Sequence, residues 1–103
     1  MDRSTVLTLV AKSWQTDSIA QQIPVETTRD VFCDLRSITR AEWSAAGQLG
    51  IKPDLVAVMF GPDYEGEDIA ILDGTRYAIY RTYADRYERV ELYMEKQAGV
   101  SDV

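Results

Sequence analysis

The dipeptide Asp73-Gly74 limits the possible folds of this chain more than any other sequence feature, because it separates two runs rich in strand-forming residues. A two-residue type I′ turn needs positive φ at both positions, and Asp and Gly tolerate that conformation. Residues 69–72 and 76–83 are therefore predicted to pair as the two arms of a tight antiparallel hairpin.

Four further segments have strand chemistry. Residues 55–60 are apolar on both faces, which is typical of a strand covered on two sides. In residues 87–95, apolar and polar side chains alternate, which predicts a last strand with one wet face. Residues 5–10 and 25–35 complete the set, with turn-forming residues between them. Within residues 76–83 the pattern does not decide which face points inward.

Residues 38–53 interrupt the β pattern. Thr39 and Glu42 have capping-box spacing, and Gly50 is placed to end a helix. The pattern predicts a helix of about ten residues that starts at Arg40. A helix this short is marginal alone in water, so it must dock. The sequence leaves two roles open for this helix: it closes one end of the barrel, or it contacts a partner protein. The whole pattern favours an all-β fold, a small antiparallel β-barrel or else a sandwich of about six short strands, with one helix between strands two and three.

The composition excludes several classes of function. A chain of 103 residues is one domain, residues 1–103, with a loose tail expected at about 97–103. Histidine is absent and Cys33 is the only cysteine, which removes histidine-based catalytic sets and the familiar zinc sites. We expect no enzyme and no cofactor, and Cys33 is interpreted as a buried strand residue. No run approaches the roughly 20 apolar residues of a membrane span, so a soluble protein made in the cytoplasm is expected.

The net charge of −6 opposes free-standing affinity for nucleic acid or anionic lipid. The excess lies in residues 54–73, which contain six acids and no Lys or Arg. Residues 63–68 lack the order of an EF-hand, and nothing in the sequence raises the pKa of one acid, so a solvated hairpin tip is favoured over a calcium loop or a carboxylate pair.

Arginines and tyrosines interleave near the C-terminus: Arg76, Tyr77, Tyr80, Arg81, Tyr83, Arg86, Tyr87 and Arg89. Such a mixture can stack on single-stranded bases, as OB-type folds do, and this is the alternative hypothesis. Neighbouring acids offset the arginines, and Tyr and Arg are enriched at protein interfaces, so a protein interface is favoured.

Four blocks of sequence, in their order and spacing, resemble the head-tail joining family of tailed bacteriophages, also called head closure, stopper or head-tail adaptor proteins. The blocks are VFCDLRSITR at residues 31–40, AGQLGIKP at 46–53, DGTRYAIYRTY at 73–83 and VELY at 90–93. The resemblance implies a non-enzymatic β-barrel that forms a twelve-subunit ring beneath the portal-bound adaptor and provides the surface on which a tail docks. It places the protein in the virion, with adaptor, tail or tail completion proteins and identical copies as partners, and packaged double-stranded DNA nearby. We expect a monomer in isolation and no membrane partner.

In that family the connection between the second and third strands reaches the channel and helps retain DNA. Here that connection is residues 38–53, whose candidate channel or adaptor contacts are Thr39, Arg40, Glu42, Trp43, Gln48 and Lys52. Acidic residues facing a channel would repel phosphates and limit sticking, and the candidates are Asp63, Glu65, Glu67 and Asp68. The candidate interface residues are Tyr77, Tyr80, Arg81, Tyr83 and Tyr93.

Overall fold

The structure is a computed structural model that describes residues 5–85 and 87–97. The strands are β1 (Thr5–Thr16), β2 (Gln22–Arg36), β3 (Pro53–Phe60), β4 (Ile69–Leu72), β5 (Thr75–Ala84) and β6 (Arg89–Lys96). Helix α1 (Arg40–Gly47) lies between β2 and β3, and a short 3-10 helix, η1 (Gly61–Asp63), follows β3. The expected loose tail lies outside the described residues from residue 98 onward, and Arg86 also lies outside them.

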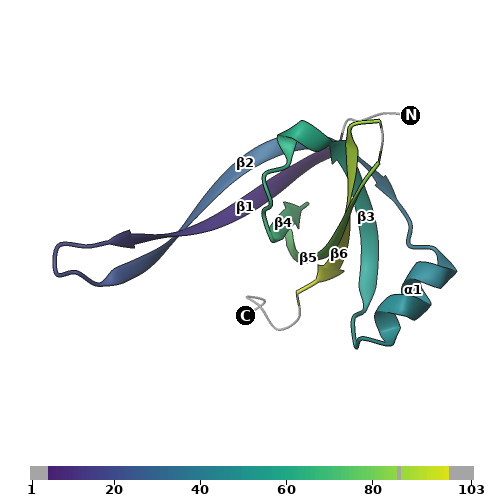
Figure 1. Cartoon of the computed structure of the whole chain (residues 1–103), viewed down its shortest axis with the longest axis horizontal. Helices are drawn as coiled ribbons and strands as arrows, with labels where there is room; N and C mark the ends of the chain where they lie inside the picture. Colours follow the sequence, from purple (N-terminus) through teal and green to yellow (C-terminus); the bar gives the residue numbers. More distant parts are fainter. Residues whose placement is uncertain (1–4, 86, 98–103) are drawn as a thin grey trace.

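The six strands close into an antiparallel barrel in the order β1-β2-β3-β6-β5-β4. Closure depends on a short ladder between β1 and β4, in which Leu9 lies opposite Ala70 and Val10 opposite Ile69. The predicted small antiparallel β-barrel, with one helix between the second and third strands, is confirmed (Figure 1).

The β4–β5 turn forms as the sequence predicts. Asp73 has φ 51° and Gly74 has φ 80°, and Leu72 pairs with Thr75 across the turn. Both central residues therefore have the positive φ that a type I′ turn requires.

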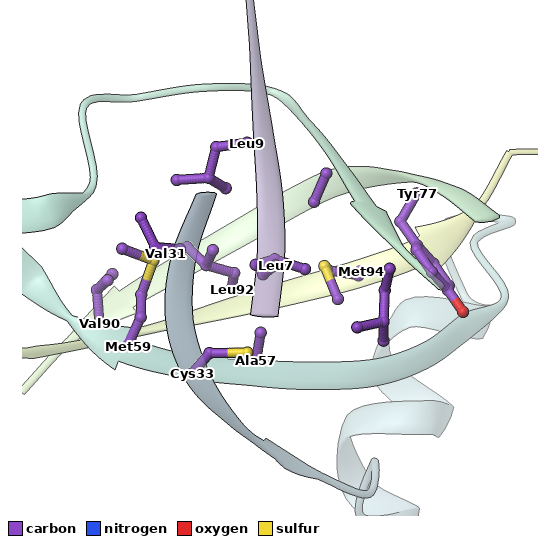
Figure 2. Close-up of a cluster of buried hydrophobic side chains, with 12 residues drawn as sticks. Leu7, Leu9, Val31, Cys33, Ala57, Met59, Tyr77, Val90, Leu92 and Met94 are labelled. Atoms are coloured by element: carbon purple, nitrogen blue, oxygen red, sulfur yellow. The ribbon is translucent and has the colours of Figure 1, made fainter. Parts of the chain in front are cut away.

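The barrel interior is filled by one cluster of apolar side chains from all six strands (Figure 2). Its buried members are Leu7, Leu9, Val31, Cys33, Ala57, Met59, Ala70, Leu72, Tyr77, Val90, Leu92 and Met94. The thiol of Cys33 is fully covered, which confirms its expected structural position. Burial, with the charge of Asp34, raises the pKa of that thiol to about 11.

A β-bulge in β5 explains why the pattern of residues 76–83 is ambiguous. Ile79 lies opposite Met94, but the next pair is Arg81 opposite Tyr93, so Tyr80 is an extra residue without a direct counterpart. Side chains alternate faces along a strand, and one inserted residue shifts that alternation. Tyr77 and Ile79 therefore pack on the core, whereas Arg81 faces outward with Tyr93.

The first two strands are much longer than predicted. β1 continues to Thr16 and β2 begins at Gln22, so residues 11–27 project from the barrel as a two-stranded ribbon, which we call the arm (Figure 1). The strands predicted at 5–10 and 25–35 are confirmed, but their predicted ends at residues 10 and 25 are wrong. Pro24 is tolerated because β2 pairs with β3 only from Cys33 onward, so among the described residues no strand lies on the outer edge of the arm at Pro24.

Candidate protein interface around helix α1

Helix α1 begins with the capping box that the sequence predicts. The Thr39 hydroxyl accepts a hydrogen bond from the Glu42 backbone N–H at 3.2 Å, and Glu42 Oε1 accepts one from the Thr39 backbone N–H at 3.0 Å. These reciprocal bonds satisfy two of the free donors at the start of the helix.

The helix is shorter than expected: it ends at Gly47 after eight residues rather than about ten, and Gly50, which was predicted to end it, lies three residues further on. Gly50 has φ +78°, and the Ile51 N–H donates to the Ala46 carbonyl at 3.0 Å, as in a Schellman-type C-cap. The Lys52 N–H then donates to Glu95 Oε1 at 2.9 Å, which ties the end of the connection to β6.

Arg36, the last residue of β2, holds the start of α1 against the barrel. Its guanidinium donates to both carboxylate oxygens of Glu42, at 3.1 and 2.9 Å, and to Glu91 of β6 at 3.2 Å. The hydrogen bonds to Arg36 lower the pKa of Glu42 to about 2, and those to Glu42 raise the pKa of Arg36. A charged pair therefore links the helix to two strands.

Tyr93 completes this network on the outer face of the barrel. Its hydroxyl lies 2.8 Å from Glu91 Oε1 and 3.0 Å from Glu42 Oε2, either of which can accept its proton, and it accepts a bond from Arg36 at 3.1 Å. Burial, together with bonding to the two carboxylates, raises the pKa of Tyr93 to about 12. The Arg81 guanidinium covers the Tyr93 ring at 4.9 Å, and the Tyr80 ring lies 6.2 Å away at a tilt of 60°.

A groove of about 220 Å³ separates α1 from this face of β5 and β6. We call it the α1 groove. Glu42 and Tyr93 lie in its wall, and its other lining residues are Ala45, Ala46, Leu49, Ile51, Tyr80 and Arg81. Leu49, at its edge, is 76% exposed, and Arg81 is exposed. The groove thus combines an apolar lining with a cation accessible to a partner.

The structure brings together residues that the sequence suggested in two separate groups. Glu42 comes from the connection, whereas Tyr80, Arg81 and Tyr93 were interface candidates, and all four line the α1 groove. Thr39 caps the helix beside them. The other connection candidates, Arg40, Trp43, Gln48 and Lys52, are exposed on the rest of the helical segment, and the last three line a second hollow next to it.

Two of the proposed interface tyrosines differ in position. Tyr77 is a core residue, 7% exposed, so its ring is not on the surface in this structure. Tyr83 lies toward the other end of β5 and is more than half exposed.

The acidic segment is not a hairpin tip. β3 neighbours β2 and β6, whereas β4 neighbours β1 and β5, so residues 61–68 connect strands that are not paired. Asp63, Glu65 and Asp68 are exposed, but the side chain of Glu67 is 3% exposed and bonds to Arg29 at 3.0 Å.

Further bonds hold this segment in place. Glu67 Oε1 accepts a bond from the Glu65 N–H at 3.0 Å, and the Glu67 carbonyl accepts one from the Tyr64 hydroxyl at 2.6 Å. Arg29 also donates to the Asp63 carbonyl. Glu67 is therefore an anchor of the loop, while its three acidic neighbours are the solvent-facing charges.

Sequence reasoning missed the apolar side chains of the arm. Trp14 is 64% exposed, Ile19 71% and Ile23 44%. The sequence did contain a signal for them. These three large apolar residues are isolated in a polar stretch with no apolar run around them, which is typical of apolar side chains that the chain's own core does not cover.

A scan against protein-family models and searches of curated proteins and of solved structures found no match to this chain. Residues 5–85 and 87–97 contain no group of three or more Cys, Asp or Glu side chains placed to hold a metal ion. No helix within the same residues is long and apolar enough to cross a membrane.

Proposed function

We propose that this chain is a structural subunit of the connector between head and tail in a tailed bacteriophage or prophage. Copies would form a ring beneath the portal-bound adaptor, help retain packaged DNA and provide the surface on which the tail docks. The proposal has two supports: the order and spacing of the four sequence blocks, and the placement of exposed apolar surfaces on the barrel.

One observation supports the proposal most strongly. The arm and helix α1 lie on opposite sides of the barrel (Figure 1). The arm exposes Trp14 and Ile19, and the α1 groove beside the helix is lined partly by exposed Leu49. A subunit of a ring needs two different contact surfaces, since each copy touches one neighbour with one surface and the other neighbour with the second. An isolated monomer gains nothing from exposing Trp14, Ile19 and Leu49.

The way in which residues 38–53 are fixed to the barrel indicates how this connection would meet a partner. Arg36 and Tyr93 hold the start of the helix, and the Lys52 N–H holds the end of the connection, so the segment is fixed to the barrel at both ends. Trp43 lies within this segment and is exposed. We therefore propose Trp43 as a contact with the adaptor or the channel.

The deciding experiment is removal of the gene from the phage or prophage that encodes it. We expect filled heads and separate tails that do not join, with some loss of packaged DNA, and restoration of joined particles by the wild-type protein supplied in trans. Normally tailed particles in the absence of the protein would refute the assignment.

The acidic segment gives a second, independent check. In a reconstruction of the connector, Asp63, Glu65 and Asp68 are expected to line or flank the bore, where they would repel DNA phosphates. If all three lie on the outer rim of the ring, this part of the proposal is wrong.

A further inference from the structure

The tip of the arm is built to present one apolar side chain. The Asp17 carboxylate accepts bonds from the Ile19 and Gln21 backbone N–H groups, both at 2.9 Å, and the Asp17 N–H donates to the Gln21 carbonyl at 2.9 Å. Ala20 adopts a φ of 66°, which completes the reversal. Ile19 therefore projects from an ordered turn, and Asp17 gives that turn a negative charge.

The α1 groove matches this tip in size and charge. At about 220 Å³ it is smaller than the roughly 300–1,000 Å³ pockets that hold drug-sized ligands, and it suits one or two aliphatic side chains. Ala45, Leu49 and Ile51 supply an apolar lining. Two charged groups also line the groove: the Glu42 carboxylate, which is paired with Arg36 at 2.9 Å, and the exposed guanidinium of Arg81, which supplies a positive charge. The tip, by contrast, offers an isoleucine and a carboxylate.

The geometry shows which molecule can bring the two together. From Ala11 to Thr16 the arm extends about 20 Å beyond the last β1–β4 pair, along the 50 Å long dimension of the protein (Figure 1). Because the arm points away from α1 (Figure 1), a chain cannot fill its own groove. A second copy supplies the complementary charge and the complementary shape at once.

We propose that the arm tip of one copy seats Ile19 in the α1 groove of a second copy, with Asp17 next to Arg81. The contact is head-to-tail, so each copy can donate its arm on one side and accept an arm on the other. Repeated contacts of this kind close into a ring when the rotation between copies permits it. The inference deepens the proposed function, on which the ring rests; the pairwise contact itself can be tested on purified protein.

The contact surface is small, since it comprises one turn and one groove. Interfaces well below about 1,200 Å² are generally weak and transient. Dilute protein is therefore expected to be monomeric, and association is expected in concentrated solution or on a template that holds the copies side by side.

A disulfide trap tests the contact. Ile19→Cys combined with Leu49→Cys, oxidised in concentrated solution, should give a ladder of dimers, trimers and larger species on a non-reducing gel. The native Cys33 is fully buried and does not compete. Circular dichroism of the reduced variant establishes that the barrel has folded before oxidation.

Ser13→Cys combined with Leu49→Cys is the matched control, because Ser13 is exposed on the shaft of the arm, away from the tip. Crosslinking at least about tenfold greater in the tip variant supports the proposal. Equal crosslinking in the two variants, or none in either, overturns it. The proposal is also overturned if, in assembled particles, the cysteine at position 19 forms a disulfide only with a different protein.

A second variant tests the charge. Asp17→Asn keeps an acceptor for the turn but removes the negative charge, and it should reduce crosslinking of the tip variant severalfold at low salt. Unchanged crosslinking contradicts the pairing with Arg81.

Failure here is distinguishable from failure of the proposed function. If the trap fails while the wild-type protein still restores joined particles, the contact is wrong and the function stands. If the ladder forms while particles join without the protein, the contact stands and the function is wrong.

Discussion

Arg36 and Glu42 meet as two parallel hydrogen bonds, Nη1 to Oε1 at 3.1 Å and Nη2 to Oε2 at 2.9 Å. Arg36 ends β2 and Glu42 lies in the first turn of α1, so this pair fixes the direction in which the chain enters the helix. Paired forks of this kind are directional, and a lysine cannot reproduce them. Arg36 therefore helps to set the position of the α1 groove, together with the bonds from Tyr93 to Glu42 and from the Lys52 N–H to Glu95.

Arg36→Lys is expected to lower the free energy of unfolding by about 1–2 kcal/mol, because an ammonium group cannot bond Glu42, Glu91 and Tyr93 together. Urea denaturation followed by circular dichroism measures the loss. Arg76→Lys is the matched control, since within residues 5–85 and 87–97 the Arg76 side chain has one ion pair, of 3.2 Å to Glu26, and a change near zero is expected there. Equal losses in both variants would show that the fork has no special role.

Acid should lower the free energy of unfolding by protonating Glu42. The pKa of this carboxyl is lowered to about 2 in the folded protein, against an ordinary value of 4.5, so the unfolded chain binds its proton first as the pH falls. The stabilisation from ionised Glu42 is complete above about pH 5 and is lost as the pH falls toward about 2.

Glu42→Gln removes this titration, so its stability should fall less steeply than that of the wild type over the same range. Urea denaturation at a series of pH values gives the comparison. Parallel curves for the two proteins would contradict the assignment.

The sequence predicted the local structure of this barrel better than its long-range structure. The capping box at Thr39 and Glu42 and the turn at Asp73 and Gly74 depend on a few adjacent residues, and both are confirmed. The arm was missed because its strands are polar and contain Pro24, and its pairing comes from continuation of the β1–β2 ladder rather than from burial. Composition carries no signal of that continuation.

The candidate site was predicted residue by residue but not as a unit. Glu42, Tyr80, Arg81 and Tyr93 were all named, yet their meeting depends on the bulge at Tyr80, which places Arg81 on the same face as Tyr93. In the sequence, a one-residue insertion in a strand is visible only as a break in the alternation of apolar and polar residues. The burial of Glu67 was equally hidden, because its partner Arg29 is distant in the chain.

Core and surface leucines should respond very differently to truncation. Leu92 is fully buried in the barrel, and Leu92→Ala is expected to cost about 2–5 kcal/mol through lost burial and the cavity that remains. Leu49 is 76% exposed, and Leu49→Ala should change the free energy of unfolding by no more than about 0.5 kcal/mol. Thermal or urea unfolding of the two variants checks this contrast. A large loss in the Leu49 variant would mean that the residue supports the fold rather than an intermolecular contact.

Single-stranded oligonucleotides should not bind. A stacking surface needs several exposed aromatic rings along a basic track, but Tyr77 is in the core and the Tyr93 ring is buried beneath Arg81. Of the interleaved tyrosines, Tyr80, Tyr83 and Tyr87 are left, in a chain with a net charge of −6. Fluorescence anisotropy with a labelled oligothymidine at low salt is expected to show no increase, since such binding is strongest there. Binding that weakens with salt and is lost in Tyr80→Ala, but not in the distant Tyr64→Phe control, would favour the nucleic-acid-binding alternative over the connector.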